Sequence, residues 1–204
     1  MIYLSVLIPT VYGREEQLKT LLGELHRQII QFDLDGQVEI LTEIDNKEMT
    51  IGEKRDRLYL KAKGLYSVQI DDDDIVHEDY LEIVTNIIKE NQDFDCIGYY
   101  ERVIIDEKVY LSLISNTNED WSTDVTACYM QVKYRRTPFF KVPIKTSICQ
   151  QVGVQPMRYG EDHDFARRIK PFMINETFIN GVMYFYESQT LTKEQHNKRY
   201  GITK

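Results

Sequence analysis

The sequence predicts an α/β fold with a mixed, mostly parallel sheet flanked by helices. Apolar runs typical of buried strands alternate with amphipathic helical patterns, and the connections between them are short. The chain of 204 residues with 42% hydrophobic content is long enough for one compact domain with a sizeable core. Because alternating units favour parallel strands with right-handed crossovers, we expect a ligand site beyond the carboxyl ends of the strands.

The first half of the chain shows a βαβαβ order. Its strands are apolar runs of strand-forming residues, and the first of them is stopped by Pro9. Leucines at helical spacing mark the first helix, and Gly64 is the expected stop of the second. The predicted strands are 2–8, 38–44 and 66–70, and the predicted helices are one that starts near Arg14 and one over 52–63.

The second half is expected to contain antiparallel pairing. A third amphipathic helix runs from Tyr80 to about Asn91, and a short helix starts at Glu161. The remaining apolar runs predict strands over 94–100, 103–113 and 182–188, the second with a turn at Asp106–Lys108.

Composition indicates a soluble cytoplasmic protein. The three cysteines are widely spaced and form no paired motif with histidine, which argues against a disulfide framework or a zinc site. The segment MIYLSVLIPT lacks the features of an export leader, and no run of about 18 apolar residues suggests a membrane span. A net charge of −8 argues against a protein that coats nucleic acid with its whole surface. No feature indicates a particular oligomeric state.

Four consecutive carboxylates, Asp71 to Asp74, directly follow the third strand. Their mutual repulsion is relieved if water or a cation surrounds them, and hard cations such as Mn²⁺ or Mg²⁺ prefer oxygen ligands supplied by carboxylates and phosphates. In an extended segment Asp71 and Asp73 share one side, while Asp72 and Asp74 point away or cap the next helix. The alternative is a solvated start of that helix with Asp74 as its N-cap.

A second acidic segment, YGEDHDFARRIK at 159–170, opens a short helix. Asp162 is a candidate general base toward a hydroxyl, with Glu161 and Asp164 as competitors. The alternative is that these carboxylates favour the helix dipole and that Asp164 pairs with an arginine one turn later.

Taken together, SVLIPTVYGREEQLKTLL, IDN, EKRDRLYLKAKGLYSVQIDDDDIVHEDYLE and VGVQPMRYGEDHDFARRI resemble the family-2 glycosyltransferases of the GT-A fold. The shared features are a first strand ending in Pro-Thr, an aspartate after the second strand, an arginine before the third, a DxD at its end and a later Glu-Asp. They occur here in that order between residues 5 and about 170. The chain departs from the family at Asn46–Glu48, where Gly-Ser-Thr is usual, and at Asp56, where asparagine is common.

The resemblance implies a GT-A domain over 1–204, with a nucleotide-sugar half at 1–100 and an acceptor half at 101–204. It implies metal-dependent transfer of one sugar from a nucleotide diphosphate sugar to an acceptor hydroxyl with inversion. The QxxRW element of processive synthases is absent, which favours single transfer. The implied residues are Pro9, Thr10, Asp45, Arg55, Asp71 and Asp72 for the nucleotide sugar, Asp73 and His196 for Mn²⁺ or Mg²⁺, and Asp162, with Glu161 beside it, for catalysis.

A basic stretch precedes the second acidic segment. Residues 125–160 contain no acid and six lysines or arginines, interleaved with aromatic rings. Arg135, Arg136 and Lys141 are therefore candidate contacts to an anionic acceptor: a glycan, a lipid phosphate or nucleic acid. The alternative is a basic surface that helps to hold the donor diphosphate.

Two other function classes are compatible with the same residues. One is a nucleotide-sugar or metal-binding module without turnover. The other is a nucleotidyltransferase, for which the Gly13-Arg14 pair after the first strand is the only trace of a phosphate loop.

Overall fold

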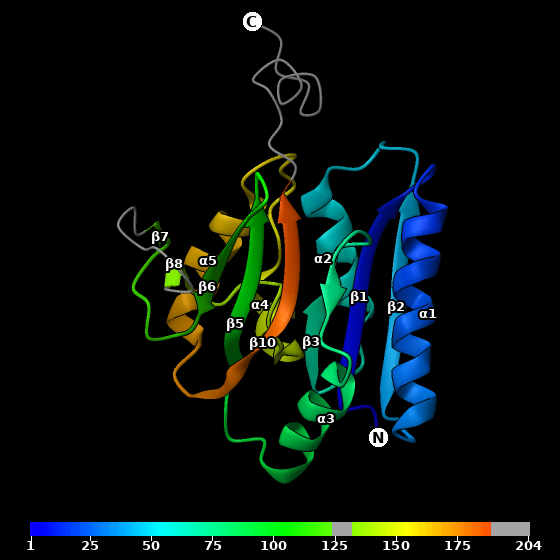
Figure 1. The fold of residues 1–204 in the computed structure, drawn as a ribbon, viewed down its shortest axis with the longest axis horizontal. Helices are drawn as coiled ribbons and strands as arrows, with labels where there is room; N and C mark the ends of the chain where they lie inside the picture. The colour runs from blue at the N-terminus through cyan, green and yellow to red at the C-terminus, as the bar shows by residue number, and fades with distance from the viewer. Residues whose placement is uncertain (124–131, 189–204) are drawn as a thin grey trace, which may run out of the picture.

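A computed structural model describes residues 1–123 and 132–188 of the chain (Figure 1). The first half forms a parallel three-stranded unit in which β1 (Leu4–Val11) lies between β2 (Val38–Asp45) and β3 (Tyr66–Gln69). This order confirms the predicted βαβαβ arrangement. The helices between these strands are α1 (Glu15–Gln31) and α2 (Ile51–Lys61).

The second half continues the same sheet with mixed pairing. The short β9 (Ile144–Lys145) runs antiparallel to both β3 and β5 (Cys96–Ile105) and so joins the two halves. The strand β10 (Glu176–Ser188) lies parallel to β5 in a long, bulged register. The remaining strands are β4 (Ile75–Val76), β6 (Lys108–Ile114), β7 (Ser122–Thr123) and β8 (Val132–Arg136).

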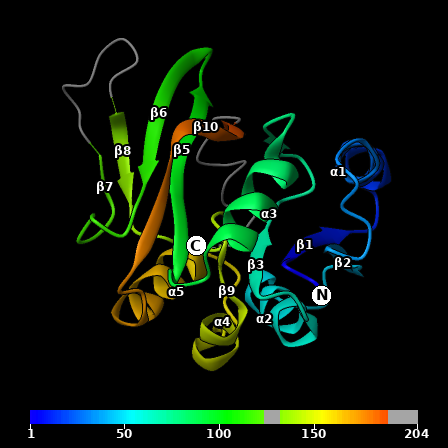
Figure 2. The same ribbon diagram turned by 90° about the horizontal axis from the view of Figure 1, so that it is seen from below.

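Helices cover both faces of the sheet. In Figures 1 and 2, α1 and α3 (Tyr80–Glu90) lie on one face. The other face carries α2, α4 (Thr146–Val152) and α5 (Glu161–Ile169), which continues into the 3-10 turn η1 (Lys170–Phe172). The sequence predicted α1, α2, α3 and α5 but not α4, which is only seven residues long.

Three predicted boundaries differ from the structure, each for a local reason. The strand β5 runs unbroken through Glu101 and Arg102, because the carboxylate of Glu101 turns inward and pairs with Lys141. The strand β10 begins at Glu176, well before the predicted 182, because its first residues already pair with β5. Gly64 is not a helix stop, since α2 ends at Lys61. A Cβ at Gly64 would lie 2.7 Å from Ser5 Oγ, so glycine is required by close approach of β1.

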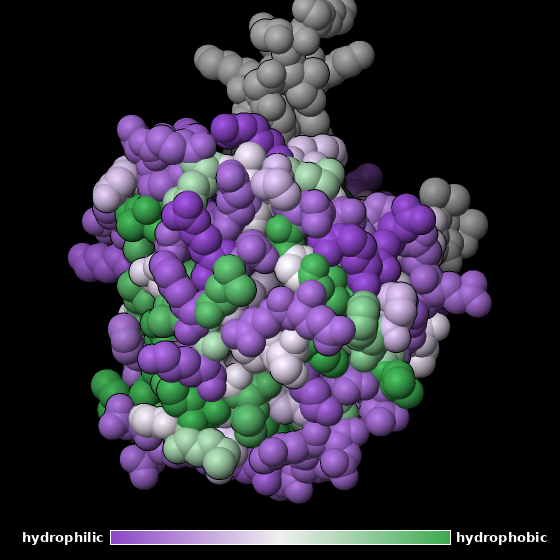
Figure 3. Space-filling model, turned by 180° about the vertical axis from the view of Figure 1, so that it is seen from behind, coloured by the Kyte–Doolittle hydropathy of each residue, from purple (hydrophilic) through white to green (hydrophobic). Residues whose placement is uncertain are grey.

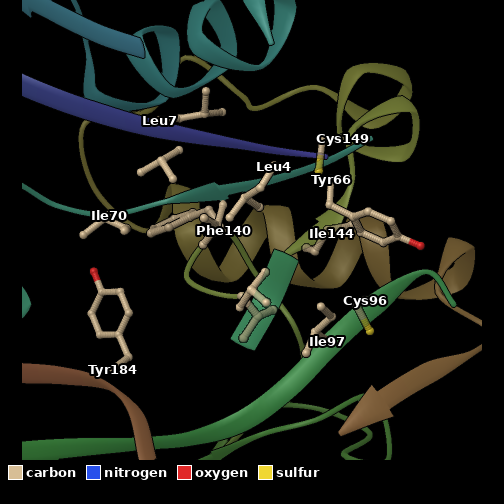
Figure 4. Close-up of a cluster of buried hydrophobic side chains, with 14 of the residues drawn as sticks. Leu4, Leu7, Tyr66, Ile70, Cys96, Ile97, Phe140, Ile144, Cys149 and Tyr184 are labelled. Carbon is tan, nitrogen blue, oxygen red and sulfur yellow. The ribbon is translucent and has the colours of Figure 1, made fainter. Parts of the chain in front are cut away.

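One hydrophobic core runs beneath both halves. Figure 4 shows Leu4 and Leu7 of β1, Ile97 of β5 and Tyr184 of β10 in the same buried cluster. The thiols of Cys96 and Cys149 are free and lie in it. Hydrophilic side chains cover most of the face seen in Figure 3, with groups of apolar residues among them, most plainly toward the lower left. Across the described ranges, none of the helices has the length and apolarity to cross a bilayer.

Candidate functional site

The carboxyl ends of β1, β2 and β3 bring most of the predicted site residues to one edge of the sheet. In the parallel register Val11 is opposite Asp45, so Thr10 and Asp45 lie at the ends of neighbouring strands. The acidic turn, residues 71–74, follows β3 on the other side of β1. The α/β topology therefore places these distant segments together, as the sequence predicts.

Arg55 connects the two acidic segments. Its guanidinium, on a side chain only 4% exposed, lies 2.9 Å from Asp71 Oδ1 through Nη2 and 3.3 Å from Glu161 Oε1 through Nε. The guanidinium carbon sits 3.6 Å above the ring of Phe140, and Nη1 donates to Gln69 Oε1 at 3.1 Å. The start of α5 is thereby held against the end of β3, although the two are about 90 residues apart along the chain.

The field at Arg55 acts differently on its two carboxylates. Burial alone raises the pKa of Asp71, but the charges of Arg55 and Lys141 outweigh it and hold that pKa below its usual value. Burial raises the pKa of Glu161 by more than the charge of Arg55 lowers it, so the pKa of Glu161 lies above its usual value. Arg55 therefore keeps Asp71 ionised at the edge of the sheet while Glu161 is the more easily protonated member of the pair.

The acidic turn does not have the alternation that an extended segment would give. The amide of Asp74 donates to the carbonyl of Asp71 at 3.0 Å, so the segment is a tight turn. Asp71 consequently contacts Arg55 and Asp73 contacts Arg14 on a different side. Neither Asp72 nor Asp74 points to solvent, and Asp74 does not cap α3, whose N-cap position is Asp79.

The two inward carboxylates of the turn are each fixed by a different element. Asp72 accepts a short hydrogen bond from Thr10 Oγ1 on β1, and burial raises its pKa. Asp74 accepts from the hydroxyl of Tyr184 on β10 at 2.6 Å and lies 3.2 Å from Lys141 Nζ. Burial raises the pKa of Asp74 to about 7, against the opposing charge of Lys141.

Asp45 is held by the ammonium group of Lys54, a residue that the sequence analysis did not single out. Lys54 Nζ on α2 contacts both Asp45 Oδ1 and the carbonyl of Thr10, and the amide of Met49 donates to Asp45 Oδ2 at 2.7 Å. Burial favours a higher pKa for Asp45, but these contacts lower it below its usual value. Pro9 precedes Thr10 inside β1, opposite Glu43 of β2.

The helix α5 begins after Gly160 and directs its acidic residues in different directions. Glu161 is buried toward Arg55, whereas Asp162 is partly exposed and accepts from the backbone amide of His163 at 2.8 Å. Asp164 forms an ion pair with Arg168 at 2.7 Å. Of the three candidate bases, Asp162 is thus the one without an ion pair among the contacts of the described residues.

Two of the three predicted acceptor residues, Arg135 and Arg136, lie on β8. Arg135 is exposed on β8, and the guanidinium of Arg136 lies 4.8 Å from the ring of Trp121 and 5.0 Å from that of Tyr134. A hollow of about 410 Å³ opens beside α5, lined by Gly160, His163, Asp164, Arg167 and Arg168.

Lys141 differs from the prediction. It is 7% exposed, and its ammonium lies 2.9 Å from Glu101 and 3.2 Å from Asp74, so it is already engaged by two buried carboxyl groups. Its apolar neighbours Phe140 and Val142 were the sequence signal for this burial.

The metal prediction depends on Asp73. Within residues 1–123 and 132–188, no group of three or more His, Cys, Asp or Glu side chains converges into a metal site. Asp73 is nevertheless 48% exposed at the edge, and a cation of the magnesium type often takes one or two carboxylates together with substrate phosphates. The donor set is compatible with such an ion. His196 lies outside the described residues.

The motif analysis did not name Lys54 or Tyr184, and it named Arg14 only as part of the trace of a phosphate loop in the nucleotidyltransferase alternative. Arg14 lies at the start of α1 and Lys54 in the first turn of α2. A basic residue at the start of a helix that follows a strand is a signal by which both could have been found. Tyr184 reaches the acidic turn from 110 residues further along the chain, and no spacing rule connects the two.

The sheet order, the two helical layers and the edge site together define the GT-A type of α/β fold. Solved structures of TarS from S. aureus share it. Residues 1–349 of TarS in complex with UDP-GlcNAc superpose with a TM-score of 0.65 at 14% identity, covering 100% of this chain and 62% of that one. The complex with UDP gives 0.62 at 15% identity, with coverages of 97% and 63%.

A further TarS 1–349 structure gives a TM-score of 0.62 at 15% identity and covers 91% of this chain and 60% of that one. The chain thus spans less than two thirds of the TarS fragment it matches. No protein-family model and no curated protein sequence matches the chain. At this level of identity the likeness establishes the fold.

Proposed function

We propose that the protein is a glycosyltransferase that moves one sugar from a nucleotide diphosphate sugar to an acceptor hydroxyl. The observation that carries the proposal is Arg55, which joins Asp71 at the carboxyl edge of β3 to Glu161, the neighbour of Asp162. Because Asp162 is the chain neighbour of Glu161, this contact supports a role for Asp162 as the base for chemistry at the edge. The sequence resemblance to family-2 enzymes supports the same reading, and the TarS complexes with UDP-GlcNAc and UDP make a UDP-sugar the first donor to test.

The residues at the edge divide into contacting and positioning groups in this proposal. Pro9, Thr10 and Asp45 border the base and ribose, with Lys54 holding Asp45 in place. Asp71 contacts the donor, and its ion pair with Arg55 fixes the orientation of the Asp71 carboxylate. Asp72 accepts from Thr10 and lies 3.0 Å from Arg14, so we assign it the role of holding these two residues at the edge.

Asp73 is the carboxylate that would hold Mn²⁺ or Mg²⁺, with His196 as the proposed second ligand. When bound there, such an ion supplies positive charge that stabilises the departing nucleotide diphosphate.

Asp162 acts as the general base. Its carboxylate accepts the proton of the acceptor hydroxyl as the hydroxyl oxygen attacks the anomeric carbon. A bond forms between that oxygen and the anomeric carbon, and the bond from the anomeric carbon to the diphosphate oxygen breaks on the opposite side. One displacement of this kind inverts the carbon and releases the nucleoside diphosphate.

The proposal is tested by binding and turnover together. We expect UDP with Mn²⁺ to raise the melting temperature, and UDP-GlcNAc to be slowly hydrolysed to UDP. Asp162→Asn should retain UDP binding and lose UDP release, whereas Asp164→Asn on the same helix should keep both, because Asp164 is engaged with Arg168. Binding without UDP release from the wild type would identify a binding module, and release of pyrophosphate would identify a nucleotidyltransferase.

An anionic acceptor is proposed for the surface formed by Arg135 and Arg136. Support comes from the exposed side chain of Arg135 and from the guanidinium of Arg136, which lies within about 5 Å of the rings of Trp121 and Tyr134. The Arg135→Ala/Arg136→Ala variant should bind a sulfated glycan, phosphatidylglycerol vesicles or single-stranded RNA more weakly, and with a smaller dependence on salt. Unchanged binding to all three probes would remove this part of the proposal.

A further inference from the structure

Arg14 lies at the point where the candidate donor edge meets α1. It occupies the N-cap position of that helix, directly after Gly13, whose φ of +94° allows the abrupt turn out of β1. The bend at Gly13 places the side chain of Arg14 against the acidic turn, residues 71–74. Its Nη2 lies 3.0 Å from Asp72 Oδ1 and forms a close ion pair with Asp73 Oδ2.

The two partners of Arg14 differ in exposure. Asp72 is buried and also accepts from Thr10, so it is a fixed anchor. Asp73 is 48% exposed, and the arginine itself is 30% exposed. The contact with Asp73 is therefore the one that solvent or a ligand can reach.

Asp73 is also the carboxylate of the turn that remains available to an incoming cation. Asp71 is engaged by Arg55, and Asp74 by Lys141 and Tyr184. Arg14 contacts Oδ2 of Asp73 and sets its positive charge beside the carboxylate, where a bound cation would also lie. Two positive charges at one carboxylate repel each other, so binding of a cation at Asp73 weakens its contact with the guanidinium.

We propose that Arg14 is a diphosphate-binding residue that exchanges between Asp73 and the nucleotide. When a divalent cation takes Asp73, the guanidinium stays anchored on Asp72 and turns its free N–H groups to the diphosphate oxygens. Guanidinium N–H groups match phosphate oxygens in pairs, which makes this contact strong and directional. This inference rests on the proposed function, since it requires a nucleotide diphosphate at this edge.

The exchange predicts opposite effects of one substitution on two ligands. Arg14→Gln frees Asp73, so Mn²⁺ alone should bind about threefold more tightly, as loss of a partly exposed ion pair implies. The same variant loses its contact to the diphosphate, so UDP in the presence of saturating Mn²⁺ should bind about tenfold more weakly or worse. A residue that only supports the fold would weaken both.

The experiment measures free Mn²⁺ by electron paramagnetic resonance and UDP binding by calorimetry, on the full chain. Arg27→Gln is the matched control, because Arg27 lies on the same helix and pairs with Glu24 at 2.6 Å. It should change neither affinity. Arg14→Lys, which keeps the charge, should lie between wild type and Arg14→Gln, and urea midpoints verify that each variant is folded.

Equal Mn²⁺ affinity in wild type and Arg14→Gln, or absence of Mn²⁺ binding in both, would overturn the exchange. Parallel weakening of Mn²⁺ and UDP would also overturn it. If Arg14→Gln tightens Mn²⁺ but the wild type binds no UDP, the contact between Arg14 and Asp73 stands as a competition for the cation, and it is the proposed function that fails.

Discussion

Replacement of Arg55 by methionine should be among the most damaging single changes in the protein. Methionine keeps an unbranched side chain but removes the guanidinium that lies over Phe140 and carries the charge that Asp71 and Glu161 share. Breaking a buried ion pair by removing one partner costs about 3–5 kcal/mol. Because Asp71 is 31% exposed, solvent screens part of its loss, and we expect the free energy of unfolding to fall by about 3 kcal/mol.

Urea denaturation at pH 8 measures this loss, with Arg57→Met as the control. Arg57 lies on the same helix, is 58% exposed and approaches Glu43 only to 3.8 Å, so its replacement should cost less than about 1 kcal/mol. The deficit of Arg55→Met should shrink at pH 5. Without the guanidinium, the native pKa values of Asp71 and Glu161 rise, and protonation then relieves the unpaired charge.

A partner substitution sharpens the test. In the Arg55→Met background, Glu161→Gln should recover part of the lost stability, because it removes one of the two orphaned charges. A loss for Arg55→Met within 1 kcal/mol of that for Arg57→Met, or a deficit that grows toward pH 5, would refute the reasoning.

Two further predictions concern Asp74 and Gly64. The raised pKa of Asp74, about 7 against an ordinary 3.8, means that the native state holds a proton which the unfolded chain has released. This contribution to stability is present below about pH 4 and is lost as pH rises through 7, so the melting temperature of Asp74→Asn should gain on wild type between pH 5 and pH 8; a constant difference would contradict it. Gly64→Ala should cost about 2 kcal/mol because its Cβ would lie 2.7 Å from Ser5 Oγ, whereas Gly23→Ala, in open space on α1, should be neutral or stabilising by about 0.5–1 kcal/mol. Equal urea midpoints for the two alanine variants would contradict the steric argument.

The positions of the edge residues could be predicted because they depend on topology. Parallel strands with helical crossovers end on the same edge, so Thr10, Asp45 and the acidic turn had to be neighbours whatever the details of packing. The amphipathic patterns located α1 and α3 for the same reason, since each buries one stripe against the sheet.

The directions of the side chains could not be predicted in the same way. Period-two alternation at Asp71 and Asp73 assumed an extended backbone, and a single hydrogen bond from the amide of Asp74 to the carbonyl of Asp71 replaced it by a turn. The charge of Lys141 counted toward a basic surface, yet its carboxylate partners Glu101 and Asp74 come from segments at least 40 residues away. Long-range pairing of this kind leaves no periodic trace in a sequence.

Burial divides the carboxylates of the acidic turn into those that mainly stabilise the fold and those that a ligand can reach. Three of its carboxylates are each held by a group from a different element: Asp71 by α2, Asp72 by β1, and Asp74 by β10 together with Lys141. The turn therefore acts as a junction between the first half of the sheet and the second, which explains why like charges are crowded there. Only Asp73 combines wide exposure with a displaceable partner, Arg14. Changes at the buried Asp72 and Asp74 should thus be felt first in folding, changes at Asp73 or Arg14 first in ligand binding, and changes at Asp71 in both.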